Sequence, residues 1–232
     1  MTQAVSTDVL ISEVGPRDGL QSVSRTMATT HKFAWIDALY AAGLREIEVC
    51  SFVPAKLMPQ MADASEVVKH ALTLPGLTVL ALVPNVRGAQ AALEAGVHKL
   101  TIPVSASEAH SRANVRKTRA EMVEEVRAIV HLRNAIAAHV HVEAGIATAF
   151  GCTIRGEVEE DDVISLAAEL AKAGADESGL SDTTGMANPA QTRRLFQRLR
   201  AERRNLNQSA MAGSKRDSNS AGVSQLRQSL GR

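Results

Sequence analysis

Residues 77–104 read LTVLALVPNVRGAQAALEAGVHKLTIPV, and this stretch decides the fold class. Two apolar runs, at 77–83 and 100–104, flank a segment at 88–95 that is rich in helix-forming residues. Gly96 stands between this segment and the second run, where a left-handed cap is favoured. The stretch therefore predicts a strand, a helix and a second strand, which together make one unit of a parallel α/β sheet.

The same alternation recurs about every 30 residues, the size of a βαβ element. The apolar runs are continuous, which is typical of a parallel sheet covered on both faces. Such repeats favour a (β/α)8 TIM barrel or a doubly wound sheet, and six units are visible where a closed barrel needs eight. We therefore expect an α/β fold of the TIM-barrel type that is incomplete. The expected strand and helix pairs are 9–14 with 30–42, 47–49 with 62–74, 77–83 with 88–95, 100–104 with 119–137, 140–147 with 162–173, and 175–180 with 189–203.

Composition narrows the class of protein. Of the 232 residues 45% are hydrophobic and 22% charged, which suits a packed core, and no apolar run approaches the roughly 20 residues of a membrane span. Only two cysteines are present, and the first ten residues lack the basic and apolar regions of a leader sequence. These features predict a cytoplasmic protein without disulfides and without a membrane partner.

Charge divides the chain unevenly. Ten of the 26 Lys and Arg residues lie from Arg193 onward, against two of the 25 acids, so the first 192 residues carry a net charge of −7 and the last forty +8. Residues 205–232 are rich in Ser, Asn, Gln and Gly and contain no strand-like run. We expect a partial barrel domain at 1–204, followed by an irregular tail at 205–232 that is disordered or not homologous to the domain.

The strongest signal for chemistry is Gly-Pro-Arg-Asp-Gly-Leu-Gln at 15–21, directly after the first expected strand. In a parallel barrel the catalytic groups lie where strands end and loops begin. The Asp18 carboxylate could bind Mg²⁺ or Mn²⁺, and the Arg17 guanidinium could stabilise a developing oxyanion. Pro, Asp and Gly are also typical of an ordinary turn, so the residues alone leave both interpretations open.

This motif resembles the signature of the hydroxymethylglutaryl-CoA lyases, within the metal-dependent barrel lyases and synthases. The resemblance covers roughly residues 9–203, because further similar residues lie at the ends of the other expected strands in order. These residues are Glu48, Ser51-Phe52, Pro-Gln-Met-Ala-Asp at 59–63, Pro84-Asn85, Ser107-Glu108, Gly151-Cys152 and Leu-Ser-Asp-Thr-Thr-Gly at 180–185.

The resemblance implies a retro-Claisen cleavage of 3-hydroxy-3-methylglutaryl-CoA to acetoacetate and acetyl-CoA, a reaction of leucine degradation. By this analogy Asp18 would be the ligand of a divalent metal and could help to take the hydroxyl proton. Arg17 would hold the enolate oxygen, and Glu48 would orient Arg17 or a ligand. An acyl-CoA substrate and a homodimer are implied as well. The polar neighbours of the substrate would be Gln21, Asn85, Ser107, Asp182 and Thr183, although ordinary loop hydrogen bonds could explain each of them.

The chain also departs from the family pattern. The family has a His-x-His pair and an Asn as further metal ligands, and a loop cysteine that protonates the product, yet no histidine follows His141 and no cysteine follows Cys152. With Asp18 alone, Mg²⁺ or Mn²⁺ would be held weakly. His139 and His141 would share a strand face, but they begin the fifth strand and would lie at the stability end of a barrel. Cys152 is either a pocket residue or a small buried hydrophobe.

Three functions follow from these observations. The first is a lyase, which the missing residues could leave inactive. The second is a non-catalytic remnant that at most binds a partner, left where the coding sequence lost its frame or its end near Arg203. A nucleic-acid binder is disfavoured, because only Phe196 interleaves the basic run and a solvated helix face explains that run. The basic run consists of Arg193, Arg194, Arg198, Arg200, Arg203 and Arg204.

Overall fold

The computed structural model describes residues 9–217. The chain divides into two compact units, Met1–Met186 and Ala187–Arg232. All strands of the described chain and every predicted site residue belong to the first unit. The domain boundary expected at residue 204 rests on the change of charge and composition along the sequence, and it stays a prediction.

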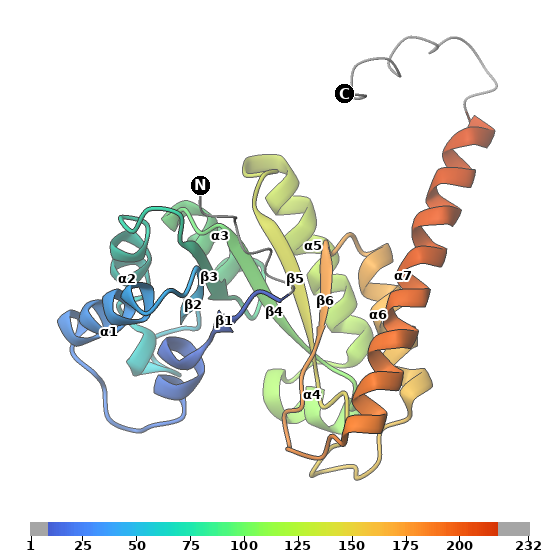
Figure 1. Ribbon diagram of the computed structural model, residues 1–232, viewed down its shortest axis with the longest axis horizontal. Helices are drawn as coiled ribbons and strands as arrows, with labels where there is room; N and C mark the ends of the chain where they lie inside the picture. The colour runs from blue at the N-terminus through green and yellow to red at the C-terminus, as the bar shows by residue number, and fades with distance from the viewer. Residues whose placement is uncertain (1–8, 218–232) are drawn as a thin grey trace, which may run out of the picture. The chain divides into compact units, whose positions relative to one another are not determined.

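The first unit is built on a single sheet of six parallel strands, neighbours in space in the order β1-β2-β3-β4-β5-β6 (Figure 1). A doubly wound sheet reverses its strand order at a switch point, whereas this sequential order is that of a TIM barrel. The predicted incomplete barrel of six units is therefore confirmed. The strands are β1 (Ser12–Glu13), β2 (Glu46–Ser51), β3 (Thr78–Leu82), β4 (Lys99–Ser105), β5 (His141–Ala147) and β6 (Glu177–Leu180).

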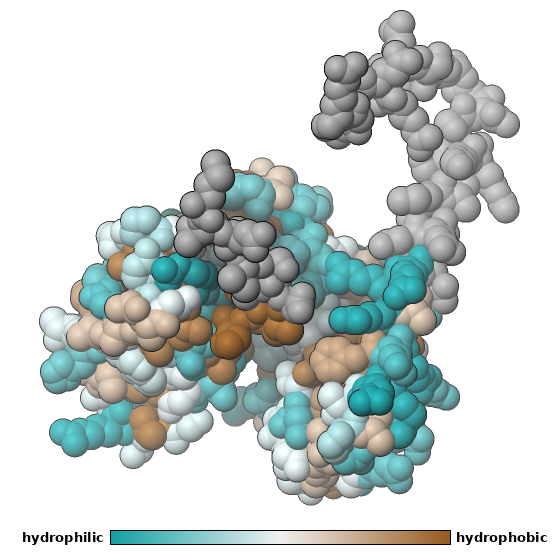
Figure 2. All heavy atoms as spheres, in the orientation of Figure 1, coloured by the Kyte–Doolittle hydropathy of each residue, from teal (hydrophilic) through white to brown (hydrophobic). Residues whose placement is uncertain are grey.

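Strand β1 is much shorter than the 9–14 expected from the sequence. Only Ser12 and Glu13 pair with β2. Val9, Leu10 and Ile11 precede the strand and are exposed, although they are strongly apolar. A strand needs a hydrogen-bonded neighbour, so apolar composition without a partner does not extend it. Figure 2 displays apolar surface gathered near the middle of one face, within surroundings that are mostly hydrophilic or neutral.

Each predicted helix of the first unit is present, and one short helix was not predicted. The unpredicted helix is α4, which begins after Ser107, whose hydroxyl accepts a hydrogen bond from the His110 N–H. None of the helices in the described part of the chain is long and apolar enough to cross a membrane. The helices of this unit are α1 (Thr29–Ala41), α2 (Ala64–Ala71), α3 (Val86–Ala95), α4 (Glu108–Val115), α5 (Arg119–Ile136) and α6 (Glu160–Lys172), with single turns η1 (Gly15–Gly19) and η2 (Pro59–Met61).

The core lies between the sheet and its helices, and β5 illustrates the pattern. Val142, Ala144 and Ile146 are fully buried, whereas the alternate residues His141 and Glu143 are only half-buried. Helix α5 packs on β4, and α6 packs on β5 and β6. The expectation of continuous apolar strands covered on both faces is thus wrong for β5. Its second face belongs to the inner face of the barrel, where polar residues are tolerated.

The second unit contains α7 (Pro189–Asp217). The helix was expected to end at residue 203, and it continues through residues 205–217, which were expected to be irregular. Leu206, Gln208, Met211 and two alanines in that segment favour a helix, although Asn and Ser residues lie between them. The rest of the expected tail, residues 218–232, lies outside the described residues.

Candidate active site

A single π-helical turn, η1, follows β1 and carries the predicted catalytic pair. The N–H groups of Arg17 and Asp18 both donate to the Val14 carbonyl, over 3.0 and 2.7 Å. Glycine is favoured at position 15, because a Cβ there would lie 2.8 Å from a carboxylate oxygen of Glu13. The turn therefore fixes Arg17 and Asp18 at the carboxyl end of the first strand.

Arg17 lies between two carboxylates that differ in burial. Its Nε donates to Glu48, and its Nη1 donates to Asp18 Oδ1 over 2.6 Å. The Thr101 hydroxyl donates to the other carboxylate oxygen of Glu48. The Glu48 side chain is 2% exposed and that of Asp18 is 59% exposed. We call Arg17, Asp18 and Glu48 the mouth cluster; the structure brings together the three residues predicted to be catalytic.

The mouth cluster combines a buried carboxylate, Glu48, with an arginine, Arg17, that is only partly hydrogen-bonded. Burial raises the pKa of Glu48, and the Arg17 charge and the Thr101 hydrogen bond offset only part of that effect. Within the described residues, Arg17 Nη2 has no hydrogen-bond partner. A buried carboxylate thus positions a cation that keeps one donor for a ligand.

The mouth cluster lines a cavity of about 900 Å³ together with Gln21, one of the predicted substrate neighbours. The side-chain oxygen of Gln21 is buried and has no hydrogen-bond partner in the described part of the chain. Buried polar atoms are rarely left unpaired, so this oxygen is suited to accept a hydrogen bond from a bound molecule.

Two more predicted substrate neighbours, Asn85 and Thr183, line the same cavity. Both also have local partners. The Asn85 side chain accepts from the Gly88 N–H over 2.9 Å and caps α3, and the Thr183 hydroxyl accepts from the Thr148 N–H over 2.8 Å. Their local hydrogen bonds hold these side chains at the cavity wall.

The remaining two, Ser107 and Asp182, do not belong to the cavity lining. Ser107 is buried, and its hydroxyl caps α4. One oxygen of Asp182 accepts from the Met186 N–H over 2.9 Å. A role of either residue in substrate binding stays a prediction. Cys152 is buried and lies outside the lining as well, with its sulfur accepting from the N–H groups of Ile154 and Arg155.

The predicted metal ligand, Asp18, is not joined by further metal-binding side chains among the described residues. No group of three or more His, Cys, Asp or Glu side chains in residues 9–217 is arranged to hold a metal ion. Glu48 is enclosed by Arg17 and Thr101. With Asp18 as the one candidate ligand among the described residues, most of the six oxygen ligands of Mg²⁺ would be water, so these residues would hold the ion only weakly.

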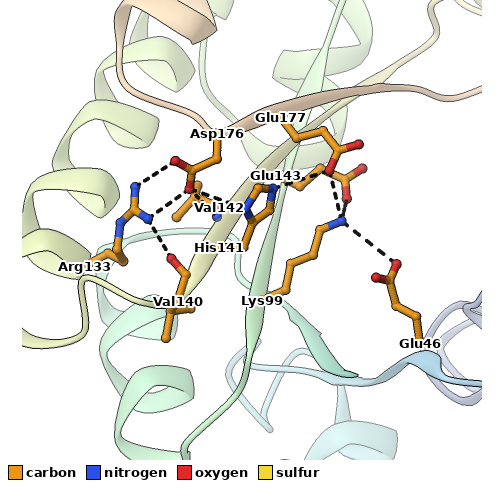
Figure 3. Close-up of polar contacts among 9 residues, drawn as sticks. All are labelled: Glu46, Lys99, Arg133, Val140, His141, Val142, Glu143, Asp176 and Glu177. Atoms are coloured by element: carbon orange, nitrogen blue, oxygen red, sulfur yellow. Dashed lines mark hydrogen bonds and ion pairs between the residues drawn. The ribbon is translucent and has the colours of Figure 1, made fainter. Parts of the chain in front are cut away.

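The inner face carries a second charged group at the amino ends of the strands (Figure 3). Lys99 Nζ lies 2.6 Å from a carboxylate oxygen of Glu143, 3.3 Å from one of Glu177 and 4.0 Å from one of Glu46. Burial lowers the pKa of Lys99, but the hydrogen bond and charge of Glu143 and the charges of the other two carboxylates raise it further than burial lowers it. We call these four residues the floor cluster.

The structure places His141 at the first position of β5, at the amino end of the strand as predicted. Its Nε2 is 3.4 Å from Glu177, and its Nδ1 is 3.9 Å from Asp176 (Figure 3). His139 precedes the strand and is exposed. The pair does not replace the missing metal ligands.

Sequence reasoning missed Thr101 and the floor cluster. The sequence pattern that could have revealed them is the presence of polar residues at alternate positions of an otherwise apolar strand, as in Lys99 and Thr101 of β4. Another missed residue is His110, which lines the cavity and has its Nδ1 2.7 Å from the Ser105 hydroxyl.

A sequential parallel sheet with a fixed Arg–carboxylate group at the mouth of its first strand defines the class: an α/β protein of the TIM-barrel type with its polar site at the carboxyl ends of the strands. Comparison with known families then places it further. The chain belongs to the HMGL-like family, whose model matches residues 8–212.

Individual relatives agree with this placement. The chain is 40% identical over 193 residues to hydroxymethylglutaryl-CoA lyase YngG of Bacillus subtilis, covering 83% of this chain and 64% of the relative. A 3-hydroxy-3-isohexenylglutaryl-CoA/hydroxymethylglutaryl-CoA lyase of Pseudomonas aeruginosa is 39% identical, with 84% of this chain and 64% of the relative covered.

Solved structures give the same result. A crystal structure of hydroxymethylglutaryl-CoA lyase from P. aeruginosa superposes with a TM-score of 0.78 at 38% identity, over 84% of this chain and 64% of the other. A lyase from Acinetobacter baumannii, in complex with coenzyme A and 3-methylmalate, superposes with a TM-score of 0.75 at 35% identity, over 80% and 60%. The chain thus spans less than two thirds of the length of these relatives.

Proposed function

We propose that this chain is a carbon–carbon lyase that cleaves 3-hydroxy-3-methylglutaryl-CoA, or a close analogue, to acetoacetate and acetyl-CoA. The observation that carries the proposal is Arg17, which is fixed between Glu48 and Asp18 at the cavity and keeps one unpaired nitrogen. The similarity to lyases at 40% and 39% identity supports the same chemistry.

The proposed reaction uses groups of the mouth cluster. Asp18 accepts the proton of the substrate's tertiary hydroxyl, and a carbonyl forms at C3 as the C2–C3 bond breaks. The bonding electron pair passes into the thioester and produces an enolate. Arg17 Nη2 donates a hydrogen bond to the enolate oxygen, and the proton that Asp18 accepted balances the one added at C2 to complete acetyl-CoA. Glu48 acts through Arg17, whose plane it fixes.

Gln21 provides a further contact in this proposal. Its unpaired side-chain oxygen could accept a hydrogen bond from a hydroxyl of the bound acyl group. Branched analogues of the substrate would need the same cation and carboxylate, so these residues alone do not select one acyl group.

A divalent metal is the cofactor that the resemblance implies; when bound, such an ion polarises a hydroxyl and lowers its pKa. The described residues offer one candidate ligand, Asp18, and the proposed steps rest on Arg17 and Asp18. A homodimer, a cytoplasmic location and a place in leucine degradation stay predictions.

Acetoacetate release from 3-hydroxy-3-methylglutaryl-CoA by the purified chain, with Mg²⁺ present, tests the proposal. We expect release above the uncatalysed background, and a decrease of about 100-fold in Arg17→Gln because an oriented cation at the oxyanion is lost. Arg25→Gln removes an exposed arginine of the neighbouring loop and should leave the rate unchanged. Circular dichroism checks that both variants fold.

Two results would overturn the proposal. Release no faster than background from the unaltered chain would favour the non-catalytic alternative. That alternative is supported by the presence of only one candidate metal ligand, Asp18, among the described residues. An undiminished rate in folded Arg17→Gln would remove Arg17 from the chemistry.

A further inference from the structure

Three side chains with permanent positive charge line the cavity, and one of them has no partner. Arg17 is paired with Glu48 and Asp18, and Lys117 is paired with Glu125 on α5. Arg116 makes no hydrogen bond or ion pair with any of the described residues. Its side chain is exposed, and it is the cation of the lining that has no carboxylate partner among the described residues.

The backbone of Arg116 is unusual for a residue that carries a side chain. Arg116 follows the last residue of α4 with φ 59° and ψ 25°, which is the left-handed conformation that favours glycine. The hydroxyl of buried Ser111 donates to the Lys117 carbonyl over 2.7 Å and fixes this turn. Among the described residues, no hydrogen bond or ion pair of the Arg116 side chain accounts for an arginine at this position, which points to a role for the guanidinium outside the fold.

The other charges of the cavity indicate where an anion can bind. Glu46, Glu48 and Glu143 line the cavity along the inner face of the sheet, and Asp18 lines it at the mouth. These carboxylates repel an anion, whereas Arg116 extends from the end of α4 without a carboxylate partner. A phosphate group therefore finds its unpaired cation at Arg116, away from these carboxylates.

We propose that Arg116 binds a phosphate group of coenzyme A while the acyl thioester lies at the mouth cluster. This inference rests on the proposed function, because it takes the substrate to be an acyl-CoA. The guanidinium matches phosphate oxygens with two parallel N–H donors, which lysine cannot do. Arg116 is thus a substrate-binding residue that selects the CoA ester over a shorter thioester.

Arg116→Gly in the full chain tests the inference, with binding of CoA and of pantetheine measured by calorimetry. We expect the dissociation constant for CoA to rise about tenfold, because a charge-assisted hydrogen bond is lost, and that for pantetheine, which lacks the phosphates, to stay unchanged. Glycine adopts φ 59° readily, so thermal stability should not decrease.

Arg112→Ala is the matched control. Arg112 lies on α4, which Arg116 follows, pairs with Glu108 over 2.9 Å and does not line the cavity. Its removal changes the net charge equally and should leave CoA binding unchanged. An equal loss in Arg112→Ala and Arg116→Gly would reduce the effect to general electrostatics and overturn the inference.

The remaining outcomes separate this inference from the proposed function. If the unaltered chain binds neither CoA nor pantetheine, the proposed function fails. If it binds CoA and Arg116→Gly binds CoA equally well, the inference fails and the proposed function stands. A loss of stability in Arg116→Gly with unchanged CoA affinity would assign Arg116 to the dipole of α4 instead, and would likewise overturn the inference.

Discussion

The mouth and floor clusters place similar charges on one inner face and use them differently. At the floor, three carboxylates surround Lys99, whose side chain is 10% exposed. At the mouth, Arg17 keeps an unpaired nitrogen, and Asp18 is largely exposed. The comparison indicates that an ionic group contributes to the fold where its partners are complete, and can serve a ligand where they are incomplete.

The choice of cation agrees with this division. An ammonium is a compact charge with three donors, and Lys99 faces three carboxylates from three other strands. A guanidinium is a planar fork, and Arg17 is oriented by two carboxylates in such a way that Nη2 remains for a ligand. Exchange of the two cations would therefore suit neither cluster.

The largest expected effect is at the floor. Lys99→Met leaves Glu46, Glu143 and Glu177 on one inner face without a cation, and removing one member of a buried ionic group is strongly destabilising. We expect the free energy of unfolding at pH 7 to fall by about 3 kcal/mol, the low end of the usual range because Glu177 is partly exposed. Urea denaturation followed by circular dichroism measures the change.

Lys69→Met is the control for this variant, because Lys69 is an exposed lysine on α2. Its removal should change the free energy of unfolding by less than about 0.5 kcal/mol. Adding Glu143→Gln to Lys99→Met should recover part of the loss, since one uncompensated charge disappears. Equal stability of Lys99→Met and Lys69→Met would show that the floor cluster does not stabilise the fold.

A smaller effect concerns pH, and its sign differs between the clusters. Burial raises the pKa of Glu177, but Lys99 and His141 lower it more, so the folded value lies below the unfolded one. Its stabilisation is present above the unfolded pKa of about 4.3 and is lost as the pH falls through the folded value. Glu48, whose pKa burial raises, contributes in the opposite direction and favours the folded state as the pH falls.

Urea denaturation between pH 6 and pH 3.5 compares the two carboxylates. Glu177→Gln should weaken the loss of stability on acidification, by less than about 1 kcal/mol because the Glu177 side chain is 46% exposed and screened. Glu48→Gln should make that loss steeper. If the free energy of unfolding falls with pH in the same way in both variants, the two carboxylates respond to acid alike, and the stated difference between the two clusters is wrong.

Much of the fold, and the mouth cluster but not the floor cluster, could be predicted from the sequence. The boundaries of strand–helix units such as 77–104 can be predicted, because left-handed glycines such as Gly96 separate a helix from the next strand. The mouth cluster was predictable because Arg17 and Asp18 are adjacent in a strand-end motif, and the family resemblance added Glu48, which lies within β2.

The floor cluster could not be predicted in the same way. Its members come from β2, β4, β5 and β6, and they meet only through the register that pairs Thr101 with Glu143 and Glu143 with Glu177. A shift by one residue would turn the same side chains to the outer face. Arg116 was hidden for a similar reason, since its left-handed backbone follows from the end of a helix that the sequence did not reveal.

The smallest expected effect is at the exposed carboxylate of the mouth. Asp18→Asn keeps the size of the side chain and removes a charge that is 59% exposed, so the free energy of unfolding should change by less than about 0.5 kcal/mol. Glu143→Gln, the same kind of change at the floor, should cost more because Glu143 Oε2 is 2.6 Å from Lys99 Nζ. Urea denaturation of both variants at pH 7 gives the difference. If Asp18→Asn costs as much as Glu143→Gln, Asp18 belongs to the structural framework, and the division between a structural floor and a ligand-binding mouth is wrong.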